Sequence, residues 1–117
     1  MRRLVIVDDH EGFRVWAREV LSHEGFDVLG TAVDGRSAVQ LVEQLSPDVV
    51  LLDIQLPDAS GFDVAELIAP HARVVLTSSR SASDYGRRVE QSPAAGFVAK
   101  AELSGHALRL VLAGGAP

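Results

Sequence analysis

The chain has 117 residues, no cysteine and a formal net charge of −5 at pH 7. That length supports one domain, and the lack of cysteine excludes a disulfide framework and a thiolate metal site. The acidic balance opposes binding to nucleic-acid backbones, so we expect no direct contact with DNA or RNA. No apolar run is long enough to span a membrane, and the N-terminus lacks the pattern of a secretory signal. We therefore expect a cytoplasmic protein that does not contact the membrane.

Short runs of β-branched residues and leucine alternate with segments whose apolar residues recur every three or four positions. The first pattern is typical of buried strands and the second of helices that pack on one side. In chain order they predict a strand at 4–7, a helix at 11–24, a strand at 28–33, a helix at 38–45, a strand at 48–52, a helix at 62–69, a strand at 73–77, a helix at 81–91, a strand at 95–99 and a helix at 103–112. Residues 114–117 are expected to fray.

Two of the predicted helices carry more specific expectations. On the first helix, Trp16 shares its face with other apolar residues, so we expect it in the core. The helix at 81–91 is the weakest prediction, because Tyr85 and Val89 are its only large apolar residues and Gly86 interrupts it. Low local stability there is what a switching element needs.

Five strand–helix repeats with strands apolar on both faces predict an α/β fold. Its parallel sheet is covered by helices on both sides, with right-handed crossovers. In open sheets of this kind, ligands bind beyond the carboxyl ends of the strands.

Polar residues stand at the predicted carboxyl ends of four strands: Asp8 with Asp9, then Asp53, Thr77 and Lys100. Three carboxylates that converge repel one another, and a divalent cation relieves the repulsion. Carboxylate, carbonyl and water ligands suit Mg²⁺, which prefers to share its shell with phosphate. A carboxylate can itself attack phosphorus and form an acyl phosphate, with the metal ion and the lysine neutralising the transferred group. The hydroxyl of Thr77 could then hydrogen-bond the attached phosphoryl group.

Each of these residues also has a simpler interpretation when taken alone. Asp8 and Asp9 could form a solvated turn that caps the next helix, Asp53 could be a helix N-cap, Thr77 could merely finish a strand, and Lys100 could lie on the surface. Their coincidence at matching strand ends argues against these readings. The histidines at 10, 23, 71 and 106 lack ligand-like spacing and are predicted on the surface.

Four segments in this order resemble the receiver domain of two-component response regulators. They are Val-Asp8-Asp9-His, Leu-Leu-Asp53-Ile-Gln-Leu-Pro57 with Gly61, Val-Val-Leu-Thr77-Ser, and Ala-Ala-Gly96-Phe97-Val-Ala-Lys100. The resemblance runs from Leu4 to Val111. It implies a five-stranded parallel sheet of order 2-1-3-4-5, the flavodoxin-like receiver fold. The sequence resembles most the receiver domains of helix-turn-helix transcriptional regulators.

The resemblance also implies a role for each site residue. Asp53 is the phosphoacceptor for a sensor histidine kinase. Mg²⁺ is bound by Asp9, Asp53 and the backbone carbonyl of Gln55, with Asp8 acting through water. Lys100 pairs with the phosphoryl oxygens, Thr77 moves to hydrogen-bond them, and Phe97 is the switch aromatic. The enzyme activity implied is limited to Mg²⁺-dependent autophosphorylation and autodephosphorylation.

Several expectations concern the whole protein. Residues 1–117 are expected to be one receiver domain with no output domain in the chain, either standing alone or cut from a longer regulator with a DNA-binding output domain. Phosphorylation is expected to change the surface around residues 77–112 and, as in many relatives, to drive homodimerisation. The family often has proline after the lysine, with a cis bond before it. Here Ala101 follows Lys100, and we expect a different loop geometry.

Two other functions stay open at this stage. One is a receiver-like interaction module that signals without phosphorylation. The other is a small Mg²⁺-dependent phosphohydrolase, which is disfavoured because that superfamily needs a second aspartate where Gln55 stands. Gln55 and Ser79 are also expected to tune how long the phosphoryl group survives.

Overall fold

Apolar residues on both faces of each central strand place the strands inside the molecule. In the computed structural model, which describes residues 2–114, five strands form one parallel sheet of order β2-β1-β3-β4-β5. The strands are β1 (Arg2–Val7), β2 (Phe26–Ala32), β3 (Val49–Asp53), β4 (Arg73–Ser78) and β5 (Gly96–Ala99). The predicted fold class and strand order are confirmed.

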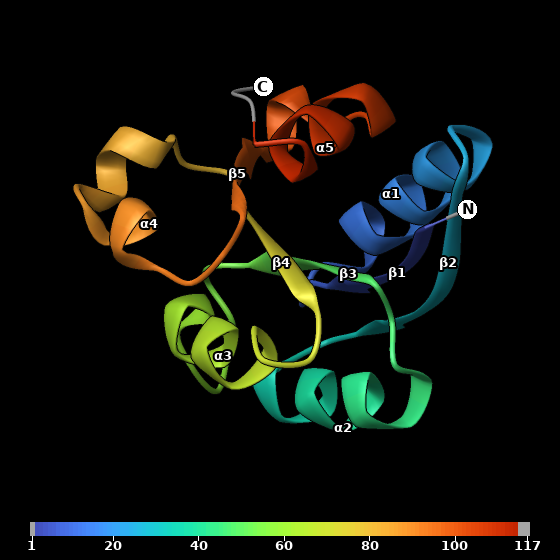
Figure 1. Cartoon of the computed structure of the whole chain (residues 1–117), viewed down its shortest axis with the longest axis horizontal. Coiled ribbons are helices and arrows are strands. Elements are labelled where there is room, and N and C mark those ends of the chain that lie inside the picture. The colour runs from blue at the N-terminus through green and yellow to red at the C-terminus, as the bar shows by residue number, and fades with distance from the viewer. Residues whose placement is uncertain (1, 115–117) are drawn as a thin grey trace.

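Helices cover both faces of the sheet (Figure 1). Helices α1 (Glu11–His23) and α5 (Gly105–Leu112) lie on one face, and α2 (Gly35–Leu45) and α3 (Gly61–Ile68) lie on the other. Short helical segments complete the chain: η1 (Ala82–Tyr85), α4 (Arg88–Gln91) and η2 (Lys100–Glu102). Within the described residues, no helix is long and apolar enough to cross a membrane.

The alternation of side chains along β1 divides the interior into two cores. Leu4 and Ile6 pack toward α1 and α5, whereas Val5 and Val7 pack toward α2 and α3. All four side chains are fully buried. Burial on both faces explains why this strand reads as a continuous apolar run rather than as an alternating one.

The register of the strands brings the polar residues at their ends together. Val7 pairs with Leu52, so the residues that follow them, Asp8 and Asp53, lie side by side. Asp53 in turn pairs with Thr77, and Thr77 pairs with Val98, two residues before Lys100.

The prediction that Trp16 lies in the core is wrong. Its side chain is 45% exposed, because the buried line of α1 runs through Ala17 and Leu21 with Phe13 partly buried beside it. Trp16 therefore flanks that line and packs against the ring of Phe13, with the two centroids 6.0 Å apart.

The segment predicted as one weak helix at 81–91 is two short pieces, η1 and α4. Gly86 lies between them with φ of +60°, a left-handed conformation that interrupts a helix and that glycine adopts without strain. Neither piece contains a buried residue. Tyr85 and Val89, the two large apolar residues of the segment, are only partly buried against the core on the α2–α3 side of the sheet.

The peptide bond between Lys100 and Ala101 is trans, and no cis bond occurs between residues 2 and 114. The short segment η2 begins at Lys100 itself, so the chain turns directly from β5 toward α5.

Candidate functional site at the carboxyl edge of the sheet

Asp8 is the innermost carboxylate at this edge of the sheet, and none of its side chain is exposed. The backbone N–H of His10 donates to Asp8 Oδ1 at 2.8 Å. The guanidinium of Arg14 on α1 donates to the backbone carbonyl of Asp8, also at 2.8 Å. These two bonds fix the chain where β1 ends and α1 begins.

Asp53 is the second buried carboxylate, with 2% of the residue exposed. The backbone N–H of Gln55 donates to Asp53 Oδ1 at 3.1 Å, and Gln55 itself forms an isolated bridge with Ser60. Gly61 lets the loop close over Asp53, because a Cβ atom at position 61 would lie 2.4 Å from the Asp53 carbonyl oxygen. The loop between β3 and α3 is thus folded tightly around this carboxylate.

Lys100 supplies positive charge to both buried carboxylates. Its Nζ lies 2.5 Å from Asp8 Oδ2 and 3.3 Å from Asp53 Oδ2. The ammonium also lies 4.6 Å from the ring centroid of Phe13, a cation–π contact that holds the side chain from the α1 side. Lys100 is therefore positioned by residues of α1, of β3 and of the loop that follows β1.

Asp53 and Lys100 both have raised pKa values, for different reasons. Burial raises the pKa of Asp53, and the negative charge of Asp8 raises it further, against the opposing effects of the Gln55 N–H and of Lys100. Burial alone would lower the pKa of Lys100, but its hydrogen bond and charge interactions with Asp8 and Asp53 outweigh this, so its pKa rises. Lys100 is thus held firmly in its charged form beside a carboxylate that resists ionisation.

Thr77 lies beside Asp53 in the sheet, but its hydroxyl is engaged elsewhere. The fully buried Thr77 Oγ1 donates to the carbonyl of Val98 at 2.7 Å. Phe97, the next residue back on β5, is half-buried, and its ring centroid lies 6.5 Å from that of Tyr85. The structure thus places Thr77 next to Asp53 without joining their polar atoms.

The donor atoms of the site fit a hard divalent cation. One ligand atom each from Asp8, Asp9, His10 and Asp53 can be chosen so that all lie within 4.8 Å of one another. Three of these residues offer carboxylate oxygens, which suit Mg²⁺. Asp9 is 35% exposed at its side chain, so the site is open to solvent on that side.

Three residues near the site were not assigned to it from the sequence: His10, Phe13 and Arg14. The prediction that His10 is on the surface is correct, since its side chain is 70% exposed. Its Nδ1 nevertheless lies 3.1 Å from Asp8 Oδ1 and 3.1 Å from Asp9 Oδ1. The signal was its position directly after two aspartates. Phe13 and Arg14 face the site only because the first turn of α1 turns them toward it.

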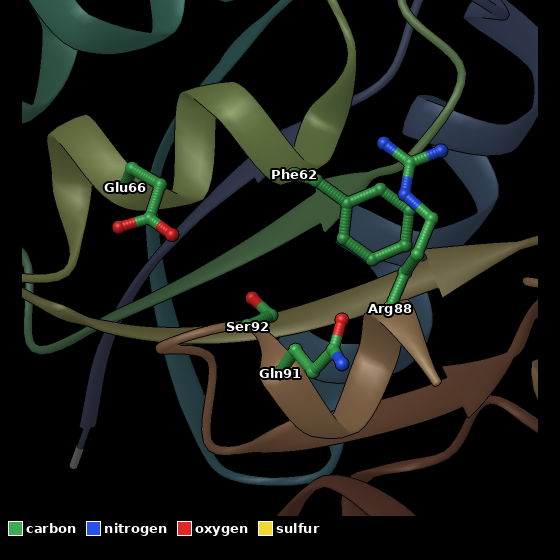
Figure 2. A pocket seen from close by; sticks show the side chains of 5 residues that line it. All are labelled: Phe62, Glu66, Arg88, Gln91 and Ser92. Atoms are coloured by element: carbon green, nitrogen blue, oxygen red, sulfur yellow. The ribbon is translucent and has the colours of Figure 1, made fainter. Parts of the chain in front are cut away.

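A separate hollow lies between α3 and α4, away from the carboxylates (Figure 2). The guanidinium of Arg88 lies over the ring of Phe62, 4.3 Å from its centroid. Glu66, Gln91 and Ser92 complete the lining. None of these residues belongs to the acidic cluster, so the hollow and the acidic site are distinct features.

Known proteins resemble the chain over almost its whole length. Residues 4–111 match the response regulator receiver domain family. The transcriptional regulatory protein DegU of Brevibacillus brevis is 35% identical over 97% of this chain and 51% of its own length. The chain thus spans about half the length of the curated relatives it matches.

Solved structures agree with the sequence comparison. The signal receiver domain of NarL from Mycobacterium tuberculosis superposes with a TM-score of 0.82 at 32% identity, over 95% of this chain and 96% of that one. A chain of the CheX–CheY–BeF₃–Mg²⁺ complex from Borrelia burgdorferi superposes with a TM-score of 0.81 at 25% identity, over 95% of this chain and 86% of that one. With a family match across its sequence and the same fold in these structures, this chain belongs to the receiver domain family of two-component response regulators.

Proposed function

We propose that this chain is a phosphorylation-dependent signalling switch that accepts a phosphoryl group on Asp53 from a sensor histidine kinase. The observation that carries the proposal is the pairing of two buried carboxylates, Asp8 and Asp53, with the single ammonium of Lys100. A lysine held between a nucleophile and a neighbouring acid is suited to accept the charge of an incoming phosphoryl group.

In the proposed reaction, an oxygen of Asp53 attacks the phosphorus of the donor. The new bond is an acyl phosphate, and the phosphorus–nitrogen bond of the donor phosphohistidine breaks with its electron pair passing to the imidazole. Lys100 lies 3.3 Å from Asp53 Oδ2 and would contact the transferred oxygens without long movement. Its raised pKa keeps it protonated through the reaction.

The cluster of Asp8, Asp9 and Asp53 supports Mg²⁺ as the cofactor. Asp9, Asp53 and the backbone carbonyl of Gln55 would bind the ion, with Asp8 acting through water. When bound, Mg²⁺ would supply positive charge toward the oxygens of the phosphoryl group. The Borrelia complex, whose name includes both BeF₃ and Mg²⁺, supports this part of the proposal.

Thr77 and Phe97 would convert phosphorylation into a change of surface. A phosphoryl oxygen on Asp53 competes with the Val98 carbonyl for the Thr77 hydroxyl. Movement of Thr77 would vacate space that Phe97, now half-buried, can enter. We propose that the surface around residues 77–112 changes in this way and meets the partner.

The half-length matches to transcriptional regulators support a longer native protein with a DNA-binding output domain. Homodimerisation on phosphorylation and the limited autophosphorylation and autodephosphorylation activity belong to the same proposal. Gln55 and Ser79 are both exposed near the end of their strands, as residues that tune hydrolysis need to be. The cytoplasmic location stays a prediction of the sequence.

The test is intact mass after incubation with acetyl phosphate, with and without Mg²⁺, for wild type, Asp53→Asn and Asp63→Asn. Asp63 is an exposed carboxylate on α3 and serves as the matched control. We expect one phosphoryl group on wild type and on Asp63→Asn, only with Mg²⁺, and none on Asp53→Asn. An equal adduct on Asp53→Asn would remove Asp53 as the acceptor. No adduct on wild type would overturn the switch and favour a phosphorylation-independent interaction module.

A further inference from the structure

We propose that His10 lets the acidic site bind first-row transition metal ions such as Ni²⁺ and Zn²⁺, because its imidazole nitrogen joins the carboxylate oxygens as a ligand. The inference rests on the proposed function only in that it uses the same acidic site, and nothing in the phosphorylation chemistry requires it. It concerns which metal ions the site selects.

The local backbone directs the imidazole into the site. His10 is the N-cap residue of α1 and has an extended conformation, with φ of −91° and ψ of 112°. Its N–H donates to Asp8 Oδ1 at 2.8 Å, which ties the residue to the innermost carboxylate. Position and conformation are therefore set by the end of β1 and the start of α1.

The ring nitrogen points inward although most of the side chain is exposed. His10 Nδ1 lies 3.1 Å from Asp8 Oδ1 and 3.1 Å from Asp9 Oδ1. One ligand atom from each of Asp8, Asp9, His10 and Asp53 lies within 4.8 Å of the others, so a small shift would let one ion contact several of these residues. The exposed side of the ring and of Asp9 leaves further positions for water, as in an open rather than a closed metal site.

Coordination chemistry then predicts which ions gain from the nitrogen. Mg²⁺ prefers oxygen ligands, whereas imidazole suits Zn²⁺, Cu²⁺ and Ni²⁺. Removing His10 should therefore weaken the binding of these ions much more than the binding of Mg²⁺. The competing interpretation is that Nδ1–H simply donates to the carboxylates. In that case removing the ring frees the oxygens, and no metal ion should bind more weakly.

The test is calorimetric titration of the tag-free chain with Ni²⁺, Zn²⁺ and Mg²⁺ for wild type, His10→Gln and His23→Gln. His23 is an exposed histidine at the other end of α1, outside the acidic site, and is the matched control. We expect the ratio of Ni²⁺ affinity to Mg²⁺ affinity to fall at least about tenfold in His10→Gln, with the same result for Zn²⁺. His23→Gln should keep the wild-type ratio.

A second measurement identifies the ligand directly. In NMR spectra, one molar equivalent of paramagnetic Co²⁺ should shift and broaden the ring resonances of His10, while those of His106 stay in place. The proposal would be overturned if His10→Gln kept the wild-type ratio of Ni²⁺ affinity to Mg²⁺ affinity, or if Co²⁺ neither shifted nor broadened the His10 resonances. The acetyl phosphate assay on wild type with Mg²⁺ is read separately. Its failure alone would remove the proposed switch and leave the metal selectivity standing.

Discussion

Asp53 is costly to bury because it lies with Asp8 beside a single ammonium. Lys100 is closer to Asp8, at 2.5 Å, than to Asp53, at 3.3 Å, so it compensates the two carboxylates unequally. Asp53 accordingly has a raised pKa, caused first by its burial and then by Asp8. A buried acid with a raised pKa lowers the stability of the folded state wherever it is ionised.

We therefore predict that Asp53→Asn is more stable than wild type at pH 7 without divalent metal. The expected gain is on the order of 1 kcal/mol, or about 4 °C in Tm. The folded state holds the Asp53 proton more tightly than the unfolded state, so wild-type stability falls as pH rises from the ordinary pKa of 3.8 through the raised one. The difference in unfolding free energy between Asp53→Asn and wild type should therefore disappear as the pH is lowered from above the raised pKa of Asp53 to below its ordinary pKa. Calorimetry in EDTA between pH 4 and 7 measures it, and an equal gap at every pH would contradict the charge argument.

Gly61 is the second residue on which the geometry of the site depends. A Cβ at position 61 would lie 2.4 Å from the Asp53 carbonyl oxygen and 2.5 Å from Ile54 Cα, both backbone atoms that cannot swing aside. Gly61→Ala should cost about 2 kcal/mol of unfolding free energy, in the range of overpacked cores.

Gly12 provides the matched control, because nothing lies within 4 Å of a Cβ built there. Gly12→Ala on α1 should raise stability by about 0.5 kcal/mol, since alanine favours the helix. Urea unfolding of both variants gives the comparison. Equal changes in the two would show that the backbone around Asp53 adapts and that position 61 does not require glycine.

Among the elements, the η1–α4 segment stands out because neither of its two pieces contains a buried residue. Its anchor is Tyr85, whose hydroxyl lies 2.5 Å from Ser78 Oγ at the end of β4. The Tyr85 ring meets the ring of Phe62 edge-on, with centroids 5.7 Å apart, and Arg88 covers Phe62 from the next turn (Figure 2). Tyr85 thus joins the segment to β4 by a hydrogen bond and to α3 and β5 by packing against Phe62 and Phe97.

We predict that Tyr85→Phe loosens the segment without unfolding the domain. The change removes the hydrogen bond but keeps the ring on Phe62, at a cost of about 1 kcal/mol. A loss of about 1 kcal/mol makes local opening roughly five times more frequent, so amide hydrogen exchange at residues 82–91 should accelerate roughly fivefold. Exchange in β1 and β3 should change less. Tyr85→Ala, which also removes the ring, should accelerate it further. If exchange at 82–91 already matches that of β3 in wild type, the segment is not an element of low stability.

At the scale of the whole molecule, the arrangement of strands was predictable because each strand is apolar throughout. A run such as Val49–Leu52 has no polar position that could face solvent, so only a sheet covered on both faces accommodates it. Once the sheet is parallel, Asp8, Asp53 and Lys100 must meet at one edge. The position of the candidate site therefore followed from the strand pattern, although the roles of its residues are still proposals.

Other features depend on tertiary contacts that periodicity does not report. Trp16 shares a helical stripe with buried residues, but the line between α1 and the sheet passes through Ala17 and leaves Trp16 at its side. The inward direction of the His10 ring depends on how the end of β1 meets α1. The sequence does not indicate which acceptor the Thr77 hydroxyl uses, and the structure shows that it donates to the Val98 carbonyl.

The last prediction concerns the link between metal binding and the stability of the whole domain. The carboxylates of Asp8, Asp9 and Asp53 come from two strand ends that separate on unfolding, so a divalent ion binds the folded state preferentially. Mg²⁺ at about 100 times its dissociation constant should therefore stabilise the chain by about 2.7 kcal/mol and raise Tm by about 10 °C. Differential scanning calorimetry across a Mg²⁺ series, at ionic strength matched with NaCl, measures the effect. Asp9→Asn should lose most of this rise and Asp63→Asn should keep it. A rise that persists in Asp9→Asn would mean that Mg²⁺ stabilises the acidic surface in general rather than through this site.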